Sequence, residues 1–216
     1  MARDRFSLLV LDGELPPLSM IADLAASAER VICTDGVARH LEFLEHPVTT
    51  IIGDMDSLED LERYADRGIE IVRNPDQYSN DFEKALVYLL EKQTHHVLII
   101  GMGGKRLDHT MTNVSVMHRF VERFESLVAI DQYGLSYIVA GPVEEHKIEA
   151  KEGTLVSLTP INTVRGVTTK ELYYPLHDAT MRFGEEEGLS NICTSNEGAR
   201  LSLREGSMLI TIVTNP

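Results

Sequence analysis

Two aspartates directly after a β-branched segment point most clearly to chemistry in this chain. Residues 49–52 (Thr-Thr-Ile-Ile) predict a buried strand, and residues 53–57 (Gly-Asp-Met-Asp-Ser) follow it with the composition of a loop. In an extended backbone Asp54 and Asp56 are two residues apart, so both carboxylates can point the same way. Mg²⁺ accepts such oxygen ligands. The alternative is a solvated turn in which these residues and Ser57 cap a following helix.

A second polar group precedes the clearest helical pattern of the chain. Residues 76–84 (Asp-Gln-Tyr-Ser-Asn-Asp-Phe-Glu-Lys) lead into an apolar stripe with helical spacing. Asn80 and Glu83 form a candidate capping box, and Asp81 falls in the first turn, where the helix dipole favours a carboxylate. Lys84 lies three residues further on, on the same side of the helix. The alternative is a well-capped helix that carries an ordinary ion pair.

A third group combines glycines, cations and an acid at residues 101–109 (Gly-Met-Gly-Gly-Lys-Arg-Leu-Asp-His). It follows a predicted strand and opens a predicted helix, which is the setting in which backbone N–H groups bind anions. It is not a Walker loop, because Arg106 stands where Ser or Thr is required. Arg106 can hold phosphate oxygens bidentately, and Asp108 could complete a metal site. The alternative is a flexible turn with Asp108 as the helix cap.

The elements that must position these groups alternate between strand and helix. This alternation predicts an α/β region with a mostly parallel, Rossmann-like sheet and flanking helices. Ligands of such sheets bind beyond the carboxyl ends of the strands, where the three groups fall. The expected strands are 6–11, 31–34, 49–52, 69–72, 96–100, 127–130 and 137–139. The expected helices are 18–28, 37–44, 58–67, a helix after the loop 73–79 whose apolar stripe runs from 82 to 90, and 108–124.

Gly141-Pro142 marks a change of character, since helical periodicity disappears after it. The pattern predicts two domains, residues 1–142 and residues 143–216, the second a small antiparallel β-sandwich or barrel. Residues 194–196 (Thr-Ser-Asn) between two strands are either a β-turn or a substrate contact. The short strands expected here are 147–150, 154–159, 163–168, 170–174, 191–195, 199–203 and 208–213.

Composition limits the partners that the chain can have. The net charge is −14, which argues against a nucleic-acid surface and against docking on anionic membranes. A phosphorylated substrate remains compatible if a divalent metal supplies positive charge. Cys33 and Cys193 are not part of a Cys-x-x-Cys pair, so we expect free thiols in a reducing cytoplasm. We expect neither a signal peptide nor a membrane-spanning segment.

Taken together and in order, these groups resemble the thiamine pyrophosphokinase family. The resemblance rests on Asp35-Gly36 and on the three groups described above, with Asn113 four residues after the last. In the β region it rests on residues 174–176 (Tyr-Pro-Leu) and on residues 194–196. The sequence departs from the usual family pattern at several places, among them Met55, Tyr78, Asn80 and Lys105, and it contains no Trp.

The resemblance implies transfer of pyrophosphate from ATP to the hydroxyl of thiamine, giving AMP and thiamine diphosphate, with Mg²⁺. It also implies an α/β domain followed by a β-sandwich, in a homodimer whose active sites lie between subunits. The metal and phosphate-site acids would be Asp54, Asp56, Asp81 and Asp108. Ligand-binding residues would be Asp35, Gln77, Lys84, Arg106 and His109 on the nucleotide side, with Ser195 and Asn196 meeting thiamine.

Two other functions stay open at this point. A metal-dependent phosphatase or nucleotidyltransferase could use Asp54 and Asp56, and product analysis would separate it from pyrophosphate transfer. A thiamine-binding or nucleotide-binding regulator without activity is the other alternative. The five acids at 35, 54, 56, 81 and 108 argue against a regulator, because binding alone does not need them all.

Overall fold

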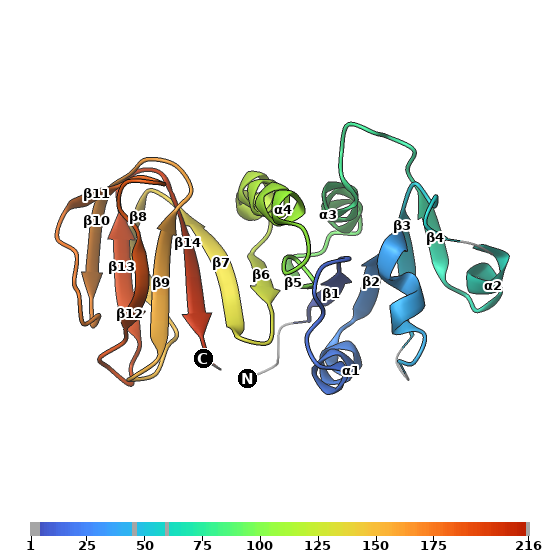
Figure 1. Ribbon diagram of the computed structural model, residues 1–216, viewed down its shortest axis with the longest axis horizontal. Coiled ribbons are helices and arrows are strands. Elements are labelled where there is room, and N and C mark those ends of the chain that lie inside the picture. Colours follow the sequence, from blue (N-terminus) through green and yellow to red (C-terminus); the bar gives the residue numbers. More distant parts are fainter. Residues whose placement is uncertain (1–4, 45–46, 59–60, 215–216) are drawn as a thin grey trace. The chain divides into compact units, whose positions relative to one another are not determined.

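The computed structural model describes residues 5–44, 47–58 and 61–214, and the chain divides into two compact units, residues 1–131 and 132–216 (Figure 1). The domain bounds expected from the sequence, 1–142 and 143–216, stay a prediction. β7 (Gly134–Ala140) belongs to the second unit, because it pairs along its whole length with β14 (Ser207–Val213).

The first unit alternates strands and helices, as its sequence predicts. Its parallel sheet has the order β6-β5-β1-β2-β3-β4, so the chain moves outward from β1 and then returns to place β5 beside it. The strands are β1 (Ser7–Val10), β2 (Arg30–Thr34), β3 (Thr50–Gly53), β4 (Glu70–Arg73), β5 (His96–Ile100) and β6 (Ser126–Ile130). Such a return creates a crevice at the carboxyl ends of the strands, where α/β proteins bind ligands.

Helices cover both faces of this sheet, with α1 on one side and α3 and α4 on the other (Figure 1). Strand residues therefore alternate between two apolar layers, which explains why the strands are nearly continuous runs of Val, Ile and Leu. Leu8 and Val10 pack with Ile21 of α1 in one layer. The helical segments are α1 (Leu18–Ser27), η1 (Asp35–Leu41), α2 (Leu61–Asp66), α3 (Asp81–Glu91), α4 (Leu107–Phe120) and η2 (Val121–Arg123).

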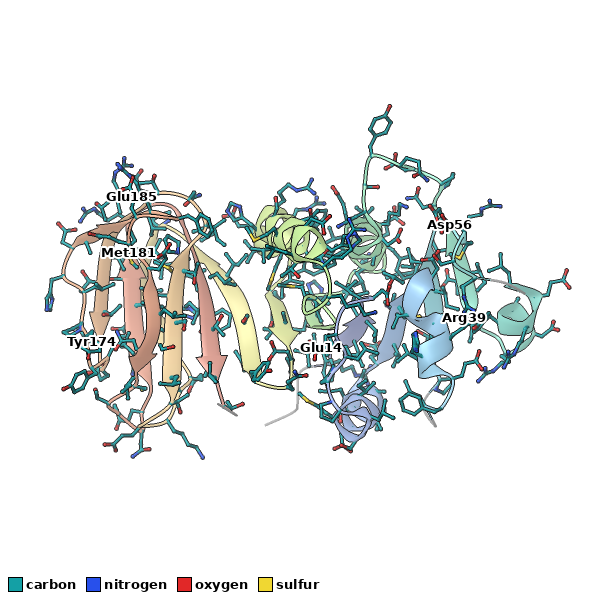
Figure 2. All side chains as sticks on the ribbon, in the orientation of Figure 1. Glu14, Arg39, Asp56, Tyr174, Met181 and Glu185 are labelled. Atoms are coloured by element: carbon teal, nitrogen blue, oxygen red, sulfur yellow. The ribbon has the colours of Figure 1, made fainter. Side chains whose placement is uncertain are left out.

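The second unit is an antiparallel β-sandwich, which confirms the fold class expected for this region. One sheet has the order β12-β9-β14-β7 and the other β11-β10-β13-β8. Met181 lies between them and is 3% exposed, whereas Tyr174 points outward (Figure 2). The remaining strands are β8 (Val143–Ile148), β9 (Leu155–Pro160), β10 (Val164–Lys170), β11 (Ala179–Met181), β12 (Gly188–Ile192) and β13 (Ala199–Leu203).

Several expected elements differ in detail. The strand expected at 170–174 is wrong, because β10 ends at Lys170 and Glu171 takes a positive φ of 57° that breaks the extended backbone. β12 begins and ends three residues earlier than expected, and β11 was not expected. The helix expected at 37–44 is instead the 3₁₀ helix η1. Part of the helix expected at 58–67 lies outside the described residues.

Within the described ranges, no helix combines the length and the apolar composition that crossing a membrane requires.

Candidate active site

Three carboxylates come together at the carboxyl ends of β2 and β3. Asp35 is the first residue after β2, and Asp54 and Asp56 follow β3. One carboxylate oxygen of each lies within 4.8 Å of the others, and this is the group of potential metal ligands found among the described residues. The sequence predicted Asp54 and Asp56 as a pair and Asp35 as a ligand-binding residue. The structure brings all three into one cluster.

Asp35 is held firmly in this cluster. Its side chain is 4% exposed, and its two carboxylate oxygens accept hydrogen bonds from the backbone N–H groups of Gly36 (2.8 Å) and Met55 (3.0 Å). A Cβ atom on Gly53 would lie 2.5 Å from Asp35 Cγ, so only glycine leaves room for the carboxylate. Burial, together with the charge of Asp81, raises the pKa of Asp35. Crowded, desolvated carboxylates of this kind favour a bound cation.

The sequence predicts an extended backbone between Asp54 and Asp56, and this prediction is wrong. β3 ends at Gly53, and Met55 takes a positive φ of 69°, so the chain turns between the two aspartates. The N–H of Asp56 donates to Asp54 Oδ1 at 3.2 Å. Gln77 Nε2 donates to the other oxygen of Asp54 at 3.2 Å, and these two hydrogen bonds lower the pKa of Asp54. Asp54 is therefore held as a carboxylate.

Asp81 begins α3, the helix that follows β4 along the chain. The Asn80 side chain caps this helix by accepting from Glu83 N at 2.9 Å, so the predicted cap is confirmed. Lys84 Nζ contacts Asp81 Oδ1 at 2.9 Å, and Lys84 is 6% exposed. This is the capped helix with an ion pair that the sequence left as an alternative. Asp81 nevertheless lines the same cavity as Asp35. Its position is therefore compatible both with a structural ion pair and with a role in the metal and phosphate site.

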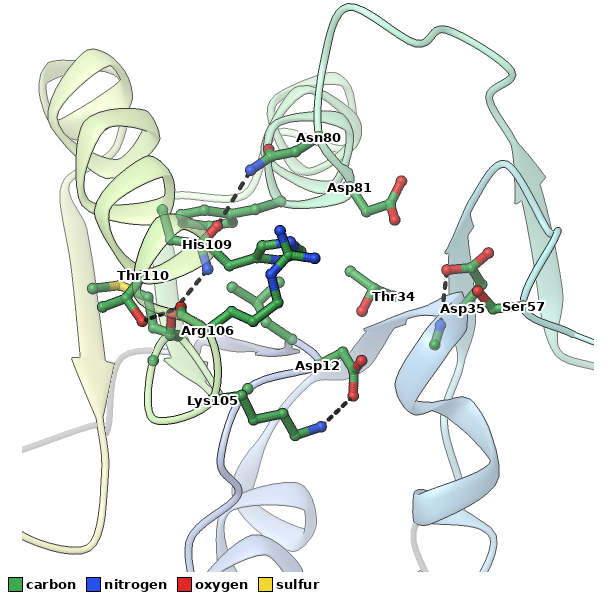
Figure 3. A pocket seen from close by; sticks show the side chains of 18 residues that line it. Asp12, Thr34, Asp35, Ser57, Asn80, Asp81, Lys105, Arg106, His109 and Thr110 are labelled. Carbon is green, nitrogen blue, oxygen red and sulfur yellow. Dashed lines mark hydrogen bonds and ion pairs between the residues drawn. The ribbon is translucent and has the colours of Figure 1, made fainter.

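A cavity of about 300 Å³ joins Asp35 and Asp81 to the glycine-rich loop that follows β5, and Asp54 and Asp56 are not among the residues that line it (Figure 3). It lies at the carboxyl ends of β1, β2 and β5, where the strand order predicts a crevice. Its lining residues are Leu11, Asp12, Gly13, Thr34, Asp35, Gly36, Ser57, Asn80, Asp81, Phe82, Gly101, Met102, Gly103, Lys105, Arg106, His109, Thr110 and Asn113.

Basic side chains lie on the other side of the cavity, at the start of α4. Lys105, Arg106 and His109 all line it, and Arg106 is the residue before the first turn of the helix. Arg106 forms a bidentate pair with Asp108, with its Nε 3.0 Å from Asp108 Oδ1. This pairing lowers the pKa of Asp108 to about 2. Asp108 thus neutralises Arg106 and does not join the described acid cluster; its role as a metal ligand stays a prediction.

Several polar cavity residues, among them Lys105 and the three described next, were not proposed as site residues from the sequence alone. Asp12 follows β1 as Asp35 follows β2, and the repeated Asp-Gly strand end could have identified it. Asn113 donates to the Met102 carbonyl at 2.8 Å and accepts from Asn80, which ties α4 to the loop and to α3. Thr34 is 5% exposed, and its hydroxyl has no hydrogen-bond partner among the described residues.

Ser195 and Asn196 lie together in a turn of the second unit, which is described by itself. Ser195 Oγ accepts from Glu197 N at 3.1 Å, and the Ser195 carbonyl accepts from Gly198 N at 3.3 Å. Asn196 Nδ2 donates to Glu152 Oε2 at 3.2 Å. The turn that the sequence analysis left open is therefore present, and contact of these side chains with a substrate stays a prediction.

Two family models match the chain, one in each part. Residues 21–129 match the model described as "Thiamin pyrophosphokinase, catalytic domain", and residues 145–208 match "Thiamin pyrophosphokinase, vitamin B1 binding domain". The first match contains the acid cluster and the basic side of the cavity. The second contains Ser195 and Asn196.

Individual proteins give the same result. The chain is 25% identical to thiamin pyrophosphokinase 1 of Caenorhabditis elegans, over 93% of this chain and 85% of that one. It is 28% identical to thiamine pyrophosphokinase 1 of Arabidopsis thaliana, over 87% and 79%. Its fold is similar to the crystal structure of thiamine pyrophosphokinase from Bacillus subtilis, with a TM-score of 0.82 and 22% identity over 98% and 100% of the two chains. The thiamin pyrophosphokinase from Candida albicans also gives a TM-score of 0.82, with 17% identity over 97% and 88%.

Proposed function

The chain belongs to the thiamine pyrophosphokinase family, and from this premise we propose that it transfers pyrophosphate from ATP to the hydroxyl of thiamine. The products are thiamine diphosphate and AMP. One observation carries the proposal: a single cavity has the acids Asp35 and Asp81 on one side and the cations Lys105 and Arg106, with the imidazole of His109, on the other. Such a cavity suits a triphosphate that bridges a divalent metal and basic side chains.

The acid cluster fits Mg²⁺ as the metal. Its donors are carboxylate oxygens, which hard divalent cations prefer, and they lie within 4.8 Å of one another. The raised pKa of Asp35 also supports a cation here. Burial and a neighbouring carboxylate disfavour the charged form of Asp35, and a bound cation would compensate that charge. Asp35, Asp54 and Asp56 would hold the metal, with Asp81 beside them. When bound, Mg²⁺ would offset the negative charge of the triphosphate.

The basic side would hold the phosphates in line for transfer. Arg106 can exchange its bidentate partner Asp108 for phosphate oxygens, and the start of α4 presents backbone N–H groups. Gln77 and Lys84 hold Asp54 and Asp81 in place, whether or not they also reach phosphate. No covalent enzyme intermediate is required.

In this reaction the thiamine hydroxyl oxygen forms a bond to the β-phosphorus of ATP. The bond from that phosphorus to the oxygen shared with the α-phosphate breaks, and AMP leaves with the electron pair. The hydroxyl proton passes to a base, for which one of the aspartates that line the cavity or His109 is the candidate. Catalysis then consists mainly of positioning and charge stabilisation.

We assign thiamine recognition to the second unit and propose that the enzyme is a homodimer. The matched vitamin B1 binding domain supports the first assignment, with Ser195 and Asn196 as hydrogen-bonding groups. Apolar side chains exposed on the second unit are candidates for the contact between subunits, since contiguous exposed apolar patches mark interaction surfaces. They are Tyr173, Tyr174, Phe183, Leu189 and Ile192.

A cytoplasmic location is part of the proposal. Cys33 and Cys193 are both buried and free, which suits a reducing compartment. Detection of the protein in fractionated cells would test this.

Product analysis tests the proposed reaction. Protein, Mg²⁺, ATP and thiamine are incubated together, and the products are identified by mass. We expect AMP and thiamine diphosphate in equal amounts, with neither formed when thiamine is left out. Release of phosphate from ATP without a thiamine product would indicate a phosphatase, adenylylated thiamine would indicate a nucleotidyltransferase, and unchanged substrates would indicate a regulator.

A further inference from the structure

Lys105 reaches across the cavity to an acid that is far away in the sequence. Its Nζ lies 2.8 Å from Asp12 Oδ1, and the dashed line in Figure 3 marks this pair. Lys105 follows the glycines of the loop after β5, and Asp12 follows β1. Both side chains line the cavity, and each is about half exposed, at 55% and 52%. The pair therefore stands at the opening of the candidate nucleotide site.

The backbone beneath this pair is closely packed. A Cβ atom on Gly13 would lie 2.1 Å from the carbonyl oxygen of Gly101, so the two segments are as close as glycine allows. Glu14 N donates to the Gly103 carbonyl at 2.7 Å, and Leu11 N donates to the Ile100 carbonyl at 2.9 Å. Breaking the ion pair would thus leave the loop in place, because other contacts hold it against the end of β1.

The pair can be exchanged at little cost. An ion pair between two half-exposed side chains contributes little to stability, because solvent screens it. A triphosphate carries several negative charges and competes well for the same ammonium group. Asp12 is also next to the acid side, since a Cβ atom on Gly36 would lie 3.3 Å from Asp12 Oδ2. An incoming metal would therefore attract the carboxylate of Asp12, just as phosphate would attract the ammonium group of Lys105.

We propose that Asp12 holds Lys105 over the cavity in the ligand-free enzyme and that Lys105 exchanges Asp12 for the phosphate chain of the nucleotide. Lys105 is then a phosphate-binding residue, and Asp12 is a positioning residue that competes with phosphate. This assignment rests on the proposed function, because it takes the nucleotide triphosphate as the ligand of the cavity.

The two partners should have opposite effects on binding of inorganic tripolyphosphate without metal, measured by calorimetry. Lys105→Met should weaken binding about fivefold, because a phosphate contact is lost. Asp12→Asn should tighten it about threefold, because Lys105 is set free. If the pair only tethers the loop, both substitutions weaken binding, and the proposal is wrong. An unchanged affinity in Lys105→Met would also refute it.

A double-mutant cycle separates this exchange from the simple loss of a negative charge. In the wild type Asp12→Asn should raise the affinity for tripolyphosphate about threefold. In the Lys105→Met background the same substitution should raise it about threefold less, so the affinity should stay nearly unchanged. Equal gains in both backgrounds would show that Asp12 acts without Lys105, against the proposal. Lys92→Met is the matched control, because Lys92 pairs with Glu70 and does not line this cavity. It should leave tripolyphosphate binding unchanged.

The outcome can be told apart from failure of the proposed function. An active wild-type enzyme whose Lys105 and Asp12 variants bind tripolyphosphate normally would refute the exchange and leave the reaction intact. A wild-type protein that makes no thiamine diphosphate, with the two opposite shifts present, would refute the reaction and leave the phosphate role.

Discussion

The two sides of the cavity are built in different ways. On the acid side Asp35 is 4% exposed, accepts two backbone hydrogen bonds and fits only above a glycine. On the basic side Lys105 and Arg106 have side chains that are 55% and 69% exposed, and each pairs with a nearby carboxylate. Asp35 is therefore fixed before any ligand arrives, whereas Lys105 and Arg106 must change partners.

This difference suggests a division of labour. A metal needs ligands at set distances, which buried backbone contacts can provide. A long and flexible phosphate chain is better bound by cations that can move, and their ion pairs with local acids keep them near the site. Substitutions on the acid side should thus act on the chemical step, and substitutions on the basic side should act more on nucleotide binding.

The largest effect on activity is expected from removing a carboxylate of the cluster formed by Asp35, Asp54 and Asp56. Asp54→Ala or Asp56→Ala should reduce kcat by about 10²-fold or more, because charge stabilisation in the transition state is worth about 3 kcal/mol. Both residues are at least partly exposed, so thermal unfolding should change little. Asp23→Ala on the exposed side of α1 is the control. Near-native turnover of both variants with Mg²⁺ would remove the metal assignment.

A smaller but sharper effect is expected from Gly53→Ala, which leaves every functional group in the chain. The added Cβ would lie 2.5 Å from Asp35 Cγ, so the carboxylate must move. A displacement of about 1 Å in a catalytic group can reduce activity tens of times. Steady-state kinetics and thermal unfolding measure the two effects.

Gly68→Ala is the control for this variant, because nothing lies within 4 Å of its Cβ, although its φ of +78° makes alanine strained. It should lower stability by about 1 kcal/mol and leave kcat unchanged. If kcat is also unchanged in Gly53→Ala, the exact position of the Asp35 carboxylate does not matter for activity, and this part of the account is wrong.

On the basic side, Arg106→Lys keeps the charge and loses the bidentate geometry. We expect kcat/KM for ATP to fall roughly 20-fold, mainly through KM, because lysine cannot copy the planar fork of the guanidinium. Arg119→Lys is a matched control on the same helix, since Arg119 forms a bidentate pair with Glu83 and does not line the cavity. Equal kinetics in the two variants would place Arg106 on the surface.

The features of the fold and the site that depend on short sequence patterns could be predicted, whereas features that depend on backbone turns or on distant residues could not. Continuous apolar runs predicted the buried parallel strands, and Asn80 predicted the start of α3. The family resemblance was confirmed over both parts of the chain. The turn at Met55 was missed, because a left-handed residue other than glycine leaves no clear sequence signal. Asp12 was missed as a site residue because its partner Lys105 lies 93 positions away, although Asp12 shares the Asp-Gly strand end with Asp35.

The β-sandwich was predicted in class but less well in detail, for the same reason. β11 is three residues long and is defined by its pairing with β10. The end of β10 depends on the positive φ of Glu171. Pairing between distant segments determines where such strands begin and end, and the local sequence of a short polar strand does not indicate that pairing.

The smallest effects are expected in the second unit, from Ser195→Ala and Asn196→Ala made separately. Loss of one hydrogen bond to thiamine should cost about 1 kcal/mol, or roughly fivefold in affinity. Calorimetry with thiamine and with ATP separates the ligands, and ATP binding should not change. Reduced thermal stability with unchanged thiamine affinity would show that the two residues serve only the turn that they form with Glu197 and Gly198.

The bond that breaks in ATP tests the central claim most directly. ATP carrying a radiolabel in its β-phosphate is incubated with the protein, thiamine and Mg²⁺, and the labelled products are separated. The account predicts that the label appears in thiamine diphosphate, that unlabelled AMP forms in equal amount, and that chelation of the metal stops both. Label found in ADP or in free phosphate, with no labelled thiamine product, would contradict it.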